Sequence, residues 1–317
     1  MVHQAPKASA LRCLNAAFDL SATMPGLLSL HLDVFGCSEA ATRHIFHSLR
    51  SHPHLQTKLR GLSLVDSSSR DTEAVAGLRA APQLRTLDLR RFRVHHRIQT
   101  TPSYDPPGSE RQIAAAVQHL THLESLSIEA AHFVPCTDGA PPPVASLLHT
   151  VEHLAHLTTL HLCGPLSHGQ IEGLAAQPTA YTGLRRLCLA SCLMPDVAAG
   201  ALAAWLSTLP ALSSLDLSAN HLDADGIMTL VPVLASLEHL EELDLAFNRF
   251  GRTRVAAVAL ADALARPAAG RRLRKLNLNF TEIENDGARR LAPALAALPE
   301  LEAVQLSDNL FLSLIHI

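Results

Sequence analysis

A six-residue pattern, Leu-x-x-Leu-x-Leu, recurs ten times along the 317-residue chain, with two conservative replacements. The intervals between successive copies are 32, 25, 39, 34, 27, 28, 28, 33 and 28 residues, so the underlying period is about 28 with insertions. A fixed period of this length predicts a stack of similar units instead of one irregular core. The copies begin at Leu27, Leu59, Leu84, Leu123, Leu157, Leu184, Leu212, Leu240, Leu273 and Leu301.

The unit that begins at Leu212 shows what each copy encodes. Its first half alternates apolar and polar residues through Leu215 and Leu217, as a strand with one buried face does. Its second half spaces apolar residues by three and four, from Leu230 to Leu237, as an amphipathic helix does. One strand and one helix cannot bury both apolar faces alone, so successive copies must stack and share a continuous core.

These residues resemble the leucine-rich repeat family over nearly the whole chain, from about Pro25 to Asn309. The repeat length and the full helix are similar to the ribonuclease-inhibitor subclass. The resemblance implies an α/β solenoid shaped as a horseshoe of about ten repeats, with parallel strands on the concave face and helices on the convex face. Asparagines after the strands (Asn220, Asn248, Asn309) are expected to satisfy backbone groups of neighbouring repeats, with Cys192 and Thr281 filling the equivalent position.

Composition and charge narrow the setting in which such a fold works. Aromatic residues make up only 4% of the chain against 48% hydrophobic residues, which suits many small, similar packing layers. The net charge of −3 gives no basic field to draw the chain onto nucleic acid or an anionic membrane, and no apolar run is long enough to span one. With no secretory signal at the N-terminus, a cytoplasmic location with free thiols is expected.

The domain organisation follows from where the period holds. We expect a capping segment at 1–24 and a repeat domain at 25–311, ending in a tail at 312–317 that matches no repeat position and resembles a translated transposase end sequence. The repeat domain has insertions near 91–110, 134–143 and 266–272. The first is either a partner-binding arm or a solvated loop, and the basic residues around the third indicate nuclear targeting or a basic helix end.

Motifs for chemistry are absent: the chain has no phosphate-binding loop, dinucleotide-binding loop, zinc-protease motif or serine-hydrolase motif. His149, His153 and His156 have the spacing of one helix face and allow a metal site, but His119 and His122 repeat the pattern, so duplication explains the pairs without metal. We therefore predict no metal and no cofactor. The many histidines leave pH-sensitive binding open.

Alternation within each copy predicts which residues point out of the strands and away from the core. Further along the chain this outward set has acidic members at Asp33, Asp88 and Glu129, interrupted by Arg90 and Arg186. The two phenylalanines after the strands are either anchors for a basic partner or part of the solenoid's own rim packing. The candidate partner-binding residues are Asp216, Glu242, Asp244, Phe247, Lys275, Asn277 and Phe280.

The leading function is therefore a non-enzymatic scaffold that binds a protein partner, one with a basic surface, on the concave face. Two alternatives remain. The stretch from Leu273 to Asn309 resembles Ran GTPase-activating proteins, which implies a small GTPase as partner. The chain is also similar to the repeat domains of NOD-like receptors and of ubiquitin-ligase adaptors, whose effector domains would lie outside this sequence.

Overall fold

A computed structural model of the chain describes residues 28–33, 46–47, 49–65, 68–69, 76–89, 93–94, 113, 115–129, 153–164, 166, 168–176, 181–265 and 272–311. The predicted capping segment (1–24), the insertion at 134–143 and the tail (312–317) lie outside the described residues, as do nearly all of the insertions near 91–110 and 266–272. The chain divides into two compact units, Met1–Leu157 and Thr158–Ile317.

The first unit contains four parallel repeat strands in the order β1-β2-β4-β6. The middle leucines of the pattern stand opposite one another, with Leu62 between Leu30 and Leu87. The strands are β1 (Ser29–Asp33), β2 (Gly61–Val65), β4 (Thr86–Leu89) and β6 (Ser125–Glu129), and a separate pair is formed by β3 (Ser68–Ser69) and β5 (Arg93–Val94).

The helices whose bounds the structure describes in the first unit are short. Helix α3 (Pro53–Lys58) has six residues, and the 3-10 helix η1 (Ala76–Ala80) lies between β2 and β4. The repeat between Leu59 and Leu84 is the shortest interval, at 25 residues. A 3-10 helix suits such a connection because it is used in short pieces.

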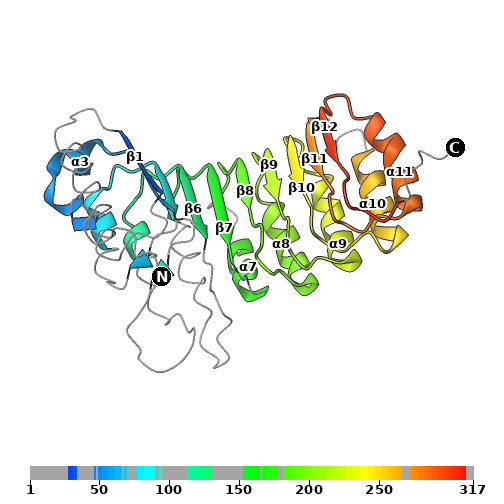
Figure 1. Ribbon diagram of the computed structural model, residues 1–317, viewed down its shortest axis with the longest axis horizontal. Helices are drawn as coiled ribbons and strands as arrows, with labels where there is room; N and C mark the ends of the chain where they lie inside the picture. The colour runs from blue at the N-terminus through cyan, green and yellow to red at the C-terminus, as the bar shows by residue number, and fades with distance from the viewer. Residues whose placement is uncertain are drawn as a thin grey trace, which may run out of the picture. The chain divides into compact units, whose positions relative to one another are not determined.

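The second unit contains six parallel strands in sequence order, and its helices follow one another along one side of them (Figure 1). The strands are β7 (Thr159–Cys163), β8 (Arg186–Cys188), β9 (Ser214–Asp216), β10 (Glu242–Asp244), β11 (Lys275–Asn277) and β12 (Ala303–Gln305). The helices are α7 (His168–Ala175), η2 (Asp196–Ala198), α8 (Ala199–Leu206), α9 (Ala224–Leu234), α10 (Arg254–Leu264) and α11 (Asn285–Ala296). This strand-and-helix layering is the predicted leucine-rich repeat solenoid. Among the described helices, none is both long and apolar enough to cross a membrane.

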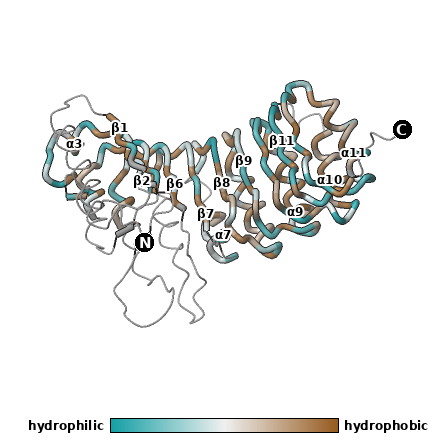
Figure 2. Tube along the Cα trace, in the orientation of Figure 1, coloured by the Kyte–Doolittle hydropathy of each residue, from teal (hydrophilic) through white to brown (hydrophobic). Residues whose placement is uncertain are grey.

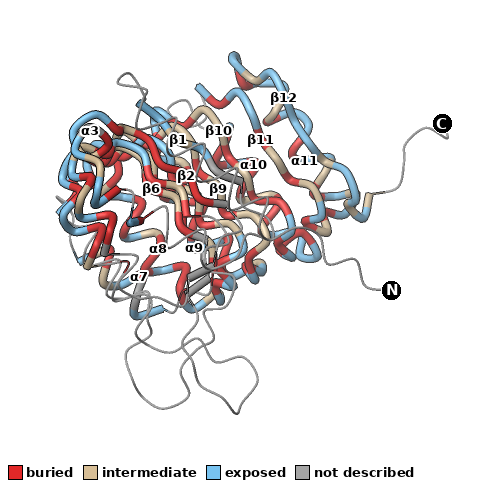
Figure 3. The backbone as a smooth tube through the Cα atoms, turned by 60° about the vertical axis from the view of Figure 1, so that its left-hand side comes forward, coloured by how far each residue is buried: buried red, intermediate tan, exposed pale blue. Residues whose placement is uncertain are grey.

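The core of the second unit is built from the leucines of the pattern. Leu212, Leu215 and Leu217 are almost fully buried, and the equivalent leucines of the neighbouring repeats are buried with them. Hydropathy alternates along the chain, and buried residues recur through successive strand–helix layers (Figures 2 and 3). The largest buried pair is Tyr181 and Trp205, whose rings meet edge to face with centroids 5.6 Å apart. Truncation of one such leucine to alanine typically costs about 2–5 kcal/mol of folding free energy.

The asparagines after the strands close the gap that each strand leaves when it ends. The Oδ1 of Asn220 accepts hydrogen bonds from the backbone N–H groups of Cys192 and Met194, each at 3.1 Å. Its Nδ2 donates to the carbonyl oxygens of Leu189 and Leu217 at 2.9 Å. Asn248 and Asn309 make the same kind of contacts with the repeats before them. Their predicted structural role is confirmed.

The two substitutes for asparagine also act structurally. The buried thiol of Cys192 donates to the carbonyl oxygen of Leu162 at 3.2 Å, and burial raises its pKa well above the ordinary value. The hydroxyl of Thr281 donates to the carbonyl oxygen of Leu278 at 2.9 Å. Cys163, Cys188 and Cys192 are free thiols, and a thiol held protonated by burial is a poor nucleophile.

Candidate functional site

The outward side chains of the second unit form aligned rows, because its parallel strands are in register. A first row runs across the start of the strands and contains Arg186, Ser214, Glu242, Lys275 and Ala303. A middle row lies two residues further along and contains Cys188, Asp216, Asp244, Asn277 and Gln305. Five of the seven predicted partner-binding residues therefore lie side by side on one face of the sheet.

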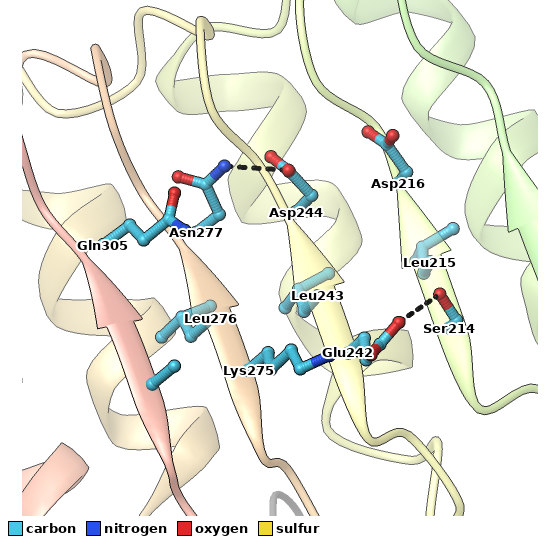
Figure 4. Close-up of a pocket in the computed structure, with 11 residues that line it drawn as sticks. Ser214, Leu215, Asp216, Glu242, Leu243, Asp244, Lys275, Leu276, Asn277 and Gln305 are labelled. Atoms are coloured by element: carbon cyan, nitrogen blue, oxygen red, sulfur yellow. Dashed lines mark hydrogen bonds and ion pairs between the residues drawn. The ribbon is translucent and has the colours of Figure 1, made fainter.

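These two rows border a hollow of about 270 Å³ on the sheet face (Figure 4). Its floor is formed by Leu215, Leu243 and Leu276, and its walls by polar side chains of β9, β10, β11 and β12. Three residues that border it, Ser214, Ala303 and Gln305, were not among the candidates, although strand alternation places them on the same face as the candidates.

The charges of the first row are paired with each other. The Nζ of Lys275 lies 2.7 Å from Oε1 of Glu242, and the hydroxyl of Ser214 donates to Oε2 of Glu242 at 3.2 Å. The hydrogen bond from Lys275, aided by its charge, lowers the pKa of Glu242, and the same contact raises the pKa of Lys275. This pair is partly exposed, so it contributes little to stability, and its main effect is to neutralise one wall of the hollow.

The carboxylates of the middle row are held in fixed orientations by their own strands. The Oδ1 of Asp216 accepts from the backbone N–H of Ser218, and the Oδ1 of Asp244 from that of Ala246, both at 2.9 Å. On the other oxygen, Asp216 accepts from the thiol of Cys188 at 3.3 Å and Asp244 accepts from the side-chain amide of Asn277 at 2.8 Å. Each carboxylate oxygen keeps a further lone pair for a ligand.

No positive charge balances these two carboxylates within the described part of the chain, since no Lys or Arg there lies within 4.0 Å of either group. Burial raises the pKa of Asp244, and repulsion from the charge of Asp216 adds to the rise. Burial and the same charge raise the pKa of Cys188 to about 12, so its sulfur remains a thiol that donates to Asp216. The two carboxylates of the middle row are therefore held in place with no described Lys or Arg beside them.

The two candidate phenylalanines lie beyond the ends of β10 and β11 and stack on each other. The ring centroids of Phe247 and Phe280 are 4.4 Å apart with an interplanar angle of 12°. The side chains remain 54% and 43% exposed. They therefore pack against one another, as the rim interpretation expects, and still present a large apolar surface to a ligand, as the anchor interpretation expects.

Other outward residues are placed differently. Asp88, in the first unit, accepts from the hydroxyl of Ser63 at 3.3 Å. The side chains of Asp33 and Glu129, and the whole of Arg90, lie outside the described residues. Of the basic residues near the third insertion, Arg274 pairs with Glu300 and Glu302 across the neighbouring strand, so it is part of a structural ion-pair set.

The helix face that the histidine spacing allows is not present in the described residues. His153 and His156 lie in a turn before β7, and His149 lies outside the described residues. Leu154 and Leu157, which are spaced in the same way, are buried in the core, and this spacing is compatible with a turn as well as with a helix. His156 instead stacks on His122 of the preceding repeat, with ring centroids 6.3 Å apart. In the parts of the chain that the structure describes, no group of three or more His, Cys, Asp or Glu could hold a metal ion.

Comparisons with known proteins agree with this geometry. A sequence profile of the family described as Leucine Rich repeat matches residues 209–231, 236–253 and 271–292. The chain is 38% identical to the Tonsoku-like protein of Mus musculus over 109 residues, which cover 33% of this chain and 8% of that protein. It is 32% identical to the ribonuclease inhibitor of Sus scrofa over 143 residues, covering 44% of this chain and 30% of that protein.

Among solved structures, an internalin from Listeria monocytogenes str. 4b F2365 aligns with a TM-score of 0.41 and 15% identity, over 89% of this chain and 92% of that one. The chain spans less than a third of the length of each of the two curated relatives. The recurring strand–helix layers and the asparagines that join them form leucine-rich repeats, which the family profile matches in the second unit, and part of the chain is similar to the ribonuclease inhibitor.

Proposed function

We propose that this chain binds a protein partner on the exposed sheet face of its second unit, with a basic surface of that partner over Asp216 and Asp244. Leucine-rich repeat proteins are in general protein-interaction scaffolds, and the fold offers a broad preformed surface with no ordering cost in the scaffold. The face and the charge of the partner are the specific parts of the proposal.

The observation that carries the proposal is the unbalanced charge of the middle row. Glu242 in the first row already has Lys275, whereas the carboxylates of Asp216 and Asp244 have hydrogen-bond donors but no described cation within 4.0 Å. Burial and the charge of Asp216 disfavour the ionised form of Asp244, and a bound cation offsets both effects. Paired charges that are desolvated at the centre of an interface also discriminate strongly between partners.

The binding face can be tested by site-specific photo-crosslinking in an extract of cells that express the chain. Gln305 borders the hollow and is exposed, so Gln305→p-benzoylphenylalanine places a crosslinker on the sheet face. Met228, 37% exposed on α9, provides the matched position on the helix side. We expect a discrete crosslinked protein from position 305 and none from position 228.

The role of the charges is tested in the same experiment with Asp216→Asn and Asp244→Asn combined. These changes keep the shape of the side chains and remove both charges, so we expect the crosslink yield from position 305 to fall about tenfold or more. The proposal is overturned if the partner crosslinks through position 228, or if the neutral variant crosslinks at position 305 as well as the unchanged chain does.

A further inference from the structure

Phe247 follows the hollow along the chain, in the turn three residues after the end of β10 at Asp244. Three residues span at most about 11 Å, so the Cα atoms of Asp244 and Phe247 are no farther apart than that. The backbone between them stays alongside its neighbour: the N–H of Leu245 donates to the carbonyl of Asn277 at 3.0 Å, and that of Phe247 donates to the carbonyl of Asn279 at 2.9 Å. A polar and an apolar feature are thus held at a fixed separation.

Between these two features the chain carries Ala246, whose short side chain is buried, and its counterpart in the preceding repeat is Ser218. Neither residue has a long side chain that a ligand spanning the carboxylates and the aromatic rings would have to displace.

The phenylalanines occupy a backbone conformation that does not favour them. Phe247 and Phe280 have φ values of 56° and 53°, in the left-handed region, where a bulky side chain is a strained outlier. The equivalent positions in other repeats carry the smaller residues Ser191, Ala219 and Asp308 at φ values of 56°, 52° and 57°. Full burial does not offset this strain, since both rings remain about half exposed. Exposed aromatic rings at a strained position are typical of a binding anchor.

We propose, on the basis of the function proposed above, that the partner docks an extended peptide segment along β10. An arginine side chain of the segment enters the hollow between Asp216 and Asp244, and a large apolar side chain on the same face of the segment, two or four positions away, packs on the Phe247–Phe280 stack. Arginine fits because its planar fork of N–H donors matches two fixed carboxylates. Its positive charge also complements Asp216 and Asp244, which have no described Lys or Arg within 4.0 Å.

The proposal is tested with a random twelve-residue peptide library displayed on phage and selected against the folded chain. We expect enriched sequences that contain Arg and a large apolar residue separated by one or three positions, a spacing that places both on one face of an extended peptide. For a selected synthetic peptide, measured by fluorescence anisotropy, Asp216→Asn with Asp244→Asn should weaken binding about tenfold or more. Replacing the peptide's arginine by glutamine should weaken binding equally, and the two changes together should add no further loss.

Phe280→Asn tests the second contact and separates a binding role from a structural one. Asparagine tolerates the left-handed conformation, so the melting temperature should stay within about 4 °C of that of the unchanged chain while affinity falls about tenfold. Matched controls away from these contacts are Glu238→Gln, an exposed carboxylate in the turn before β10, and Val255→Ala, 61% exposed on α10. Neither control should change peptide affinity.

The proposal is overturned if no peptide is enriched, or if the enriched peptides lack a basic residue. It is also overturned if the peptide binds the Asp216→Asn, Asp244→Asn variant with unchanged affinity, or if Phe280→Asn causes a large loss of stability. Each of these results leaves the broader proposal intact if position 305 still crosslinks a folded protein in a charge-dependent way. Loss of that crosslink would instead refute the binding face itself, so the two failures are distinguishable.

Discussion

At the scale of single residues, the most informative contrast is between Glu242 and Asp244. The two carboxylates are neighbours on β10 and face the same hollow, yet their pKa values move in opposite directions. The hydrogen bond from Lys275 lowers the pKa of Glu242, and burial raises the pKa of Asp244. The hydrogen bond that Asp244 accepts from Asn277 does not replace a positive charge. This difference is the reason for which the proposed cation contact is assigned to Asp244 and not to Glu242.

A pH-dependent stability follows from Asp244. Because burial raises its pKa above the usual 3.8, the folded protein binds this proton more tightly than the unfolded chain does. The resulting stabilisation is fully present below the unfolded pKa and is lost as the pH rises through the folded value. We expect the free energy of unfolding of the unchanged chain, relative to Asp244→Asn, to increase as the pH falls from 7.5 to 4. Urea unfolding of both proteins at several pH values measures this difference, and a constant difference would contradict the assignment.

At the scale of elements, the repeats are held together by close backbone contacts as well as by leucines. The N–H of Gly251 donates to the carbonyl of Thr281 at 2.8 Å, in the turn that follows β10. A Cβ built at Gly251 would lie 2.4 Å from the backbone nitrogen of Ile283. This approach joins two successive repeats and leaves no room for a side chain.

Gly251→Ala should therefore lower the free energy of unfolding by about 2 kcal/mol or more, because backbone atoms of the next repeat must move. Gly200 is the matched control, since it lies in α8 and a Cβ there meets nothing within 4 Å. Gly200→Ala should raise the free energy by about 0.5–1 kcal/mol through helix propensity. Thermal or urea denaturation of the two variants gives the comparison, and equal effects would refute the close-contact explanation.

Strand alternation explains how much of this face was predictable. The pattern in which two leucines flank one outward residue places Asp216, Asp244 and Asn277 in one row, and the register of the strands confirms that placement. The thiol of Cys188 that donates to Asp216 was not predicted, because it depends on the offset between β8 and β9. The spacing around His153 allowed a helix, and the structure has a turn there, because the spacing of the buried Leu154 and Leu157 fits both structures. Periodicity identifies which residues are buried, but it does not fix the backbone between them.

At the scale of the whole molecule, a stack of repeats has no single centre, and each layer is protected by its neighbours. In the second unit the middle leucines of β9, β10 and β11 are 1–2% exposed, whereas Val304, their counterpart in β12, is 37% exposed. Stability should accordingly differ from layer to layer along this unit.

Hydrogen exchange followed by mass spectrometry should show this gradient. We expect the backbone amides of β12 to exchange faster than those of β9 and β10, because the β12 layer buries less apolar surface and opens at a lower free energy cost. Peptides that cover β9 and β10 serve as the internal reference. Uniform protection from β9 to β12 would indicate that the unit unfolds as one cooperative block.

The register of the strands also limits the direction in which an extended peptide can lie on this surface. Neighbouring members of the middle row recur about every 4.8 Å across the sheet, whereas side chains on one face of an extended peptide recur about every 6.7 Å. The side chains of a peptide laid across the strands therefore lose alignment with the middle row after one or two contacts. The side chains of a peptide laid along a strand stay aligned, because both chains share the same rise per residue. The repeat spacing of the sheet differs from that of a peptide across the strands and equals it along the strands, so the sheet favours short segments aligned with its own strands.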